Sequence, residues 1–185
     1  NTNINIRDYL KNTVIGKHEK GYQNNPNDTG NFVDGKNIGT NYGISAKTLK
    51  HHLGRTPTVK EMKGLKEKTA IDIYEKKYWK DPKIDKLPKH IQKNVLDMGI
   101  NAGPGRAIKL LQKKAGVIRD GKIGPNTLSK SKEVTNDAYT KVRKSFYKNI
   151  VKKDPKKKEF LKGWLNRAAS FIIPGAEGSE LTKEN

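Results

Sequence analysis

Three side chains in the N-terminal quarter of the sequence have the chemistry needed to cleave a glycosidic bond: Glu19, Asp28 and Thr40. Glycoside hydrolysis uses two carboxyl groups that flank a cleft: one protonates the leaving oxygen, and the other positions water or stabilises the positive charge on the sugar. The proton donor must stay protonated near neutral pH, which requires partial burial. Glu19 can be buried against Ile15, whereas Asp28 belongs to a polar, solvated segment.

Spacing alone does not establish this interpretation. On spacing alone, Glu19 is better explained as a surface glutamate, Asp28 as a turn residue and Thr40 as part of a turn or strand edge. Asp34, which lies between Asp28 and Thr40, is a rival second carboxylate. The choice between Asp28 and Asp34 stays open at this level.

Helical periodicity dominates the elements that would position these residues. Apolar residues repeat every three to four positions in the first segment, Ile4 to Lys20, and in most of the chain after residue 44. The segment from Gln23 to Gly43 is instead rich in Asn, Asp and Gly, which favours a small β-hairpin or irregular loop. Ser45 is expected to cap a helix, and Thr58 with Glu61 has capping-box spacing. We therefore predict a mainly α (α+β) fold with one β-excursion after the first helix.

The composition narrows the choice of partner. The sequence holds 39 Lys and Arg against 19 Asp and Glu, a formal charge of +20, which attracts polyanions. Lys is more frequent than Arg, and the Lys ammonium lacks the forked geometry with which the Arg guanidinium forms two hydrogen bonds to guanine. No specific nucleic acid is therefore expected. There is no Cys, the four His have no metal-ligand spacing, and no apolar run approaches the ~20 residues that span a bilayer. We expect no metal, no cofactor and no transmembrane segment.

Several motifs in order along the chain resemble a known family. The run from Glu19 to Gly30, followed by the run from Gly39 to Ser45, resembles the signature of glycoside hydrolase family 108, the N-acetylmuramidases of the phage endolysin type. The resemblance continues through residues 73–79 and 97–103. Residues 111–112, 120–128 and 160–167 resemble the peptidoglycan-binding region that usually follows this catalytic module.

The resemblance implies a lysozyme-like fold and hydrolysis of the β-1,4 bond between N-acetylmuramic acid and N-acetylglucosamine. Glu19 falls on the catalytic glutamate of the family. The spacing from Glu19 to Asp28 also resembles that of T-even phage lysozymes, so Asp28 would orient water or stabilise positive charge and Thr40 would help to hold the water. This sequence differs by an insertion, Asn31 to Ile38, which lengthens the loop between Asp28 and Thr40.

Three further residues are candidates for substrate binding. Tyr22 and Tyr42 could stack on sugar rings, although packing within the β-excursion explains them about as well. Asn101, at the end of the central apolar helix, could hydrogen-bond an acetamido group, although an ordinary role at a helix end explains it slightly better.

These inferences define an expected organisation. Residues 1–103 form the muramidase part, 104–173 a helical peptidoglycan-binding part packed on it, and 174–185 a tail. The expected partner is peptidoglycan, with the basic surface also attracting lipopolysaccharide of an anionic outer envelope. We expect a monomer encoded by a phage or prophage, made in the host cytoplasm and acting on the cell wall or in the periplasm. Two alternatives stay open: a non-catalytic cell-wall-binding protein, and a cationic membrane-active or nucleic-acid-binding protein.

Overall fold

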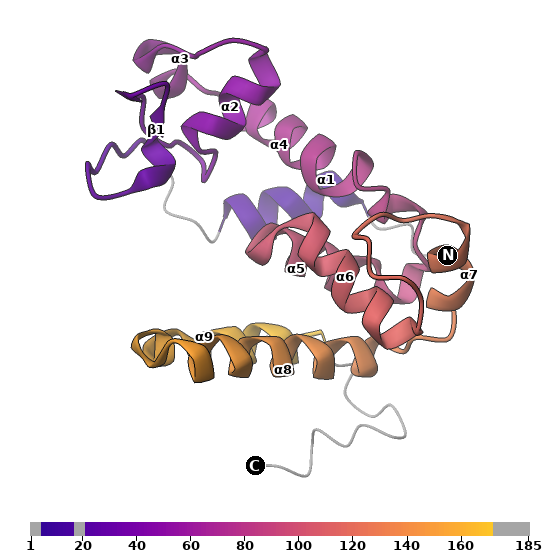
Figure 1. Ribbon diagram of the computed structural model, residues 1–185. Coiled ribbons are helices and arrows are strands. Elements are labelled where there is room, and N and C mark those ends of the chain that lie inside the picture. The colour runs from indigo at the N-terminus through magenta and orange to yellow at the C-terminus, as the bar shows by residue number, and fades with distance from the viewer. Residues whose placement is uncertain (1–4, 17–20, 172–185) are drawn as a thin grey trace. The chain divides into compact units, whose positions relative to one another are not determined.

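The computed structural model describes residues 5–16 and 21–171 of the 185-residue chain. The chain divides into two compact units, Asn1–Lys77 and Tyr78–Asn185. Helices make up most of both units, and a two-stranded hairpin in the first unit is the one sheet among the described residues (Figure 1). The prediction of a mainly α fold with a small β-excursion is confirmed.

The first helix of the N-terminal unit has two parts. Helix α1 (Ile6–Tyr9) continues directly as the π-helix η1 (Leu10–Ile15), whose apolar side chains Leu10, Val14 and Ile15 are buried. This element packs against α4 (Glu67–Glu75), and Arg7 forms ion pairs of 2.8 Å with Asp72 and Glu75. The predicted helix is thus confirmed where the chain is described, although its wider π-helical turn was not predicted.

The β-excursion is a hairpin that falls within the insertion at residues 31–38. The short 3-10 helix η2 (Thr29–Asn31) leads into strand β1 (Phe32–Val33), which pairs antiparallel with β2 (Lys36–Asn37). Asp34 and Gly35 connect the strands with φ angles of +51° and +72°. Positive φ at both turn residues is the signature of a type I′ turn, for which Asp-Gly is a preferred pair.

Three helices complete the N-terminal unit: α2 (Ala46–Leu53), α3 (Val59–Lys63) and α4. Both predicted caps are present, because the Ser45 side chain accepts a hydrogen bond from the Thr48 N–H and Thr58 forms a capping box with Glu61. Glu61 also accepts two hydrogen bonds from the Arg55 guanidinium, at 2.9 and 2.7 Å. The Arg55 contact and the Thr58 backbone N–H lower the pKa of Glu61 to about 2.

The C-terminal unit is built around one long buried helix. The π-helix η3 (Lys76–Lys80) crosses the boundary between the units and is followed by η4 (Ile84–Lys86) and by α5 (Lys89–Ala102), which Pro88 precedes. Helix α5 buries side chains along most of its length, and its Gly99 lies against Pro104 at the start of α6 (Pro104–Ala115). The chain continues through α7 (Pro125–Ser131), α8 (Asn136–Lys153), η5 (Pro155–Lys157) and α9 (Lys158–Ala169).

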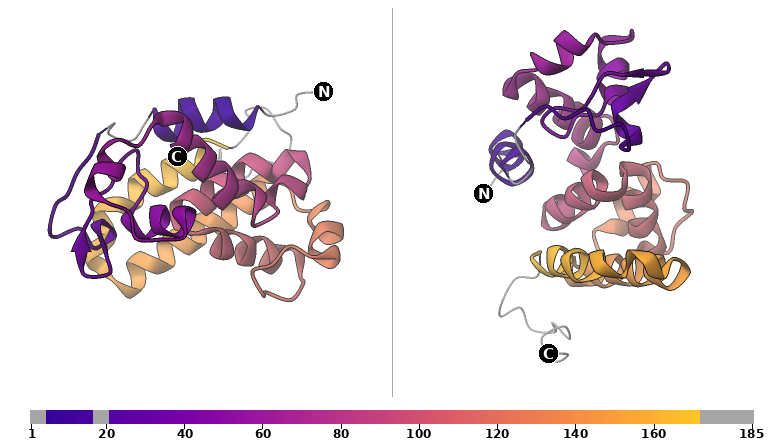
Figure 2. Two further views of the ribbon diagram at one scale, coloured as in Figure 1. Left: turned by 90° about the horizontal axis from the view of Figure 1, so that it is seen from above. Right: turned by 90° about the vertical axis from the view of Figure 1, so that its left-hand side faces the viewer.

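Helices α8 and α9 lie side by side, and α8 packs against α5 and α6 (Figures 1 and 2). The contact between α5 and these helices includes a buried ionic cluster. Asp97, which is 2% exposed, accepts hydrogen bonds from Arg143 at 2.8 Å and from Arg167 at 2.7 Å. The Arg143 side chain is fully buried and also donates to the Asn94 side-chain oxygen at 2.8 Å. This cluster holds α5, α8 and α9 together, because a buried aspartate or arginine that lost its partner would keep an uncompensated charge away from water.

Among the described residues, no helix combines the length and the apolar character that crossing a bilayer requires.

Candidate active site

Asp28 is held in place by groups that carry no charge. Its Oδ2 atom accepts a hydrogen bond of 2.8 Å from the Gln23 side-chain amide, and its Oδ1 atom accepts one of 2.9 Å from the Gly30 N–H. Asp28 thereby caps η2, and its side chain remains exposed. Within the described residues no cation forms an ion pair with this carboxylate. Among the described residues, its hydrogen-bond partners are therefore neutral.

Asn31 connects this carboxylate to Thr40. Asn31 is fully buried, and its amide donates to the Gln23 Oε1 atom at 2.7 Å while its Oδ1 atom accepts from the Thr40 hydroxyl at 2.6 Å. The backbones of Gln23 and Thr40 also pair, through hydrogen bonds of 2.9 and 2.8 Å. The structure thus brings Asp28 and Thr40 into one hydrogen-bonded network through Gln23 and Asn31.

Sequence reasoning missed Gln23 and Asn31. Asn31 appeared only as the first residue of an insertion, and one more Asn in an Asn-rich loop carries no sign that its side chain is buried. A buried amide must find partners for its donors and its acceptor, and here those partners come from residues up to nine positions away.

Asp34, the rival carboxylate, is engaged differently. Both of its oxygens accept hydrogen bonds from the Lys50 ammonium, at 2.8 and 2.9 Å, and the Thr56 hydroxyl donates to Oδ2. The Lys50 contact and then the Thr56 contact hold the pKa of Asp34 below its ordinary value. Asp34 therefore anchors the hairpin turn to α2 with its charge compensated.

The two tyrosines predicted to bind substrate have defined structural contacts in the same unit. The Tyr22 hydroxyl donates to the Ile38 carbonyl at 3.0 Å, and the Lys63 ammonium lies 5.2 Å from the Tyr22 ring centroid. Tyr42 is half-buried with a φ of +51°, and its carbonyl accepts a hydrogen bond from Tyr74 at 3.1 Å. Their roles in substrate binding stay predictions.

Glu19 lies outside the described residues, as do residues 17, 18 and 20. Its assignment as the catalytic acid stays a prediction. Among the described residues, no group of three or more His, Cys, Asp or Glu side chains could hold a metal ion.

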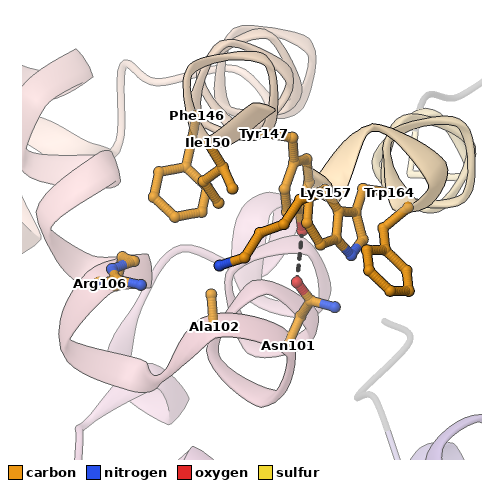
Figure 3. Close-up of a pocket in the computed structure, with 9 residues that line it drawn as sticks. Asn101, Ala102, Arg106, Phe146, Tyr147, Ile150, Lys157 and Trp164 are labelled. Carbon is orange, nitrogen blue, oxygen red and sulfur yellow. Dashed lines mark hydrogen bonds between the residues drawn. The ribbon is translucent and has the colours of Figure 1, made fainter. Parts of the chain in front are cut away.

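Asn101 lies in the C-terminal unit, at the edge of a groove of about 310 Å³ that we call the C-terminal groove (Figure 3). Its Oδ1 atom accepts a hydrogen bond of 3.0 Å from the Tyr147 hydroxyl. The side chains that line the groove are mostly aromatic or cationic, and they come from α5, α6, α8, η5 and α9: Asn101, Ala102, Arg106, Phe146, Tyr147, Ile150, Lys157, Phe160 and Trp164. Of this set, only Asn101 was predicted from the sequence to bind substrate, because residues of five separate elements converge only after folding.

The fold and these motifs define a class of protein. The sequence model described as "Glycosyl hydrolase 108" matches residues 12–103, and the one described as "Predicted Peptidoglycan domain" matches residues 106–169. The chain belongs to glycoside hydrolase family 108 and has its mainly α, lysozyme-like fold. It is a glycosidase with a peptidoglycan-hydrolysing, lysozyme-like role, and peptidoglycan is its partner.

Among solved structures the chain is similar to the one entitled "Structure of Brucella abortus SagA". The two share 33% sequence identity with a TM-score of 0.71, and the match covers 89% of this chain and 90% of the other. No curated protein matches the chain.

Proposed function

We propose that this glycosidase is an N-acetylmuramidase, which hydrolyses the β-1,4 bond between N-acetylmuramic acid and N-acetylglucosamine. In this proposal Glu19 is the general acid, Asp28 is the second carboxylate and Thr40 helps to hold the attacking water. One observation carries the proposal: the network of Gln23 and Asn31 fixes Asp28 together with Thr40. This network begins four residues after Glu19 in the sequence.

The electrostatics favour Asp28 over Asp34 as the second carboxylate. The transition state of glycoside hydrolysis carries positive charge on the sugar ring, so it is stabilised by a carboxylate whose own charge is not already compensated. Among the described residues, the partners of Asp28 are an amide and a backbone N–H, whereas Asp34 is paired with the Lys50 ammonium. Fixed neutral donors orient the Asp28 carboxylate and leave its negative charge available.

Thr40 is oriented for the role assigned to it. Its hydroxyl proton is committed to Asn31, so the lone pairs of the same oxygen remain to accept a hydrogen bond from water. A water held there would keep an oxygen lone pair for attack on the sugar, and an adjacent carboxylate could take its proton. Thr40 thus has a positioning role.

The test replaces each carboxylate by its amide. Glu19→Gln removes the proton donor and should lower the hydrolysis rate by at least about 100-fold, the usual contribution of a general acid. Asp28→Asn should also lower the rate strongly, whereas Asp34→Asn, the matched control on the same loop, should retain it. The assay uses purified peptidoglycan, borohydride reduction of the new reducing ends and acid hydrolysis, and it should yield muramitol.

Two results would overturn the assignment. Full activity of Glu19→Gln removes Glu19 from its role, and loss of activity in Asp34→Asn with retention in Asp28→Asn exchanges the two aspartates. Glucosaminitol in place of muramitol would mean that the enzyme cleaves the other glycosidic bond. Binding to peptidoglycan without any new reducing ends would identify a non-catalytic wall-binding protein.

We also propose the biological setting that the charge supports. A net charge of +20 suits an endolysin that acts as a monomer on an anionic envelope, attracted by lipopolysaccharide as well as by the wall. Association with the envelope should then weaken as salt screens the attraction.

A further inference from the structure

We propose that the C-terminal groove binds a peptide-bearing muramyl sugar, with the sugar ring on an aromatic platform and a stem-peptide carboxylate on Arg106 and Lys157. The inference rests on the proposed function for the nature of the polymer, and it does not depend on Glu19 or on catalysis. It makes the groove a determinant of substrate specificity that selects wall strands still carrying their peptides.

The platform consists of stacked aromatic rings. Trp164 stacks on Tyr147 with ring centroids 5.4 Å apart and an interplanar angle of 23°, and Phe160 stacks on Trp164 at 5.8 Å and 29°. Phe160 is 51% exposed, so a large apolar surface faces water at the groove. Pyranose rings have an apolar face that covers such a surface while their hydroxyl groups remain hydrated, and concave aromatic pockets are typical ligand sites.

The positive charge of the groove favours an anionic ligand over a neutral sugar. Arg106 and Lys157 line the groove, and none of the described residues lining it is acidic. The Arg106 guanidinium lies 5.4 Å from the Phe146 ring centroid, and the Lys157 side chain extends over the groove toward the side on which Arg106 lies (Figure 3). Two cations without a counter-charge attract an anionic group.

The carboxylates of peptidoglycan are on its peptides. The lactyl group of muramic acid is joined to the peptide by an amide bond, so the sugar strand is neutral where a peptide is attached. The nearest free carboxylates then belong to that peptide. A ligand that satisfies the aromatic platform and both cations at once is therefore a muramyl sugar with its peptide.

Asn101 supplies the remaining polar contact. The hydrogen bond from Tyr147 fixes the orientation of the Asn101 amide, and Arg143 in turn donates to the Tyr147 hydroxyl at 3.1 Å. Among the described residues, none accepts a hydrogen bond from the Asn101 Nδ2 group. This amide N–H is positioned to donate to an acetamido or peptide carbonyl of the ligand.

The experiment titrates the isotopically labelled full chain with muramyl dipeptide, N-acetylglucosamine and the free dipeptide. None of these ligands contains the bond that the enzyme cleaves, so binding is measured without turnover. The chain has two tryptophans, and only Trp164 lines the groove; Trp79 is buried and serves as an internal reference. The Trp164 indole N–H resonance should shift with muramyl dipeptide. N-acetylglucosamine should bind about fivefold more weakly because it lacks the ionic contact, and the free dipeptide should bind more weakly because it lacks the sugar ring that covers the aromatic platform.

Matched variants locate the site. Arg106→Gln should weaken binding of muramyl dipeptide about fivefold, whereas Arg119→Gln, an exposed arginine of the same unit outside the groove, should not. Phe160→Ser should weaken binding, and Ile118→Ser, which removes an even more exposed apolar side chain, should not.

The inference is overturned by any of these outcomes: no shift of Trp164, equal affinity for muramyl dipeptide and N-acetylglucosamine, or equal effects of Arg106→Gln and Arg119→Gln. Equal affinity for the free dipeptide also overturns it, because the groove would then recognise peptide alone. If the groove does not bind the ligand, the reducing-end result of Glu19→Gln is unaffected. Failure of this inference and failure of the proposed function are therefore distinguishable.

Discussion

The hydrogen-bonded network around Asn31 yields the sharpest prediction. Asn31→Ala removes three side-chain hydrogen bonds: those to Gln23 at 2.7 Å and to the Asn25 carbonyl at 3.0 Å, and the one accepted from Thr40 at 2.6 Å. A hydrogen bond contributes about 1 kcal/mol net. The free energy of unfolding should therefore fall by about 3 kcal/mol, because the site is fully buried and its former partners lose their contacts.

Activity should fall as well, even where the variant is folded. Gln23 loses its contact with Asn31, so Asp28, which Gln23 orients, is no longer held in one position. A displacement of about 1 Å in a catalytic group costs up to about 100-fold in rate. Urea denaturation followed by circular dichroism gives the stability, and reducing-end release at a temperature where both proteins are folded gives the rate.

The matched control is Asn37→Ala in the same hairpin. Asn37 donates one exposed hydrogen bond of 2.9 Å to the Asn24 carbonyl, so its loss should cost about 1 kcal/mol or less and leave the rate unchanged. If the Asn31 and Asn37 variants have equal stability and equal rates, the network does not hold Asp28 and the reasoning is refuted.

The remaining predictions concern other parts of the fold. Gly39→Ala should lower stability more than Gly35→Ala, because both positions have positive φ but only the Cβ at residue 39 would collide with the Tyr22 ring; equal melting temperatures would contradict this. The contribution of Glu61, whose folded-state pKa of about 2 lies below its ordinary 4.5, is complete above pH 4.5 and disappears as the pH falls through about 2. Glu61→Gln should therefore lower the melting temperature at pH 7 and leave it unchanged below pH 2, and a deficit that persisted at low pH would exclude this origin. Asp97→Asn should destabilise by about 3 kcal/mol or more in urea denaturation, because Arg143 keeps a buried charge that has lost its anion; a neutral effect would mean that water reaches the cluster.

The features predicted correctly from the sequence are those that local chemistry encodes. Ser45 caps α2, and Thr58 and Glu61 form a capping box, since each of these signals acts within a single turn of helix. The Gly- and Asn-rich composition likewise predicted a β-excursion, although it did not locate the strands.

The features that were missed depend on distant partners. Asn31 joins the network only because folding places Gln23 and Thr40 around it. Arg106 and Lys157 likewise line one groove only after five elements have assembled. A small hairpin or irregular loop was expected between Gln23 and Gly43, but its position within the insertion and its anchoring by Lys50 through Asp34 were not. Periodicity records which face of an element is apolar, and it carries no information on which polar side chains meet across elements.

The ionic cluster at Asp97 has a consequence for anyone who wishes to recombine these enzymes. The two family matches meet between residues 103 and 106, so a chimera joined there would take α5 from one parent and α8 and α9 from another. Such a graft would separate an aspartate from the two arginines that neutralise it. A junction near residue 77 keeps Asp97 and its two arginines on a fragment from the same parent. Fusions made there should express as soluble protein, whereas those made at residue 103 should aggregate.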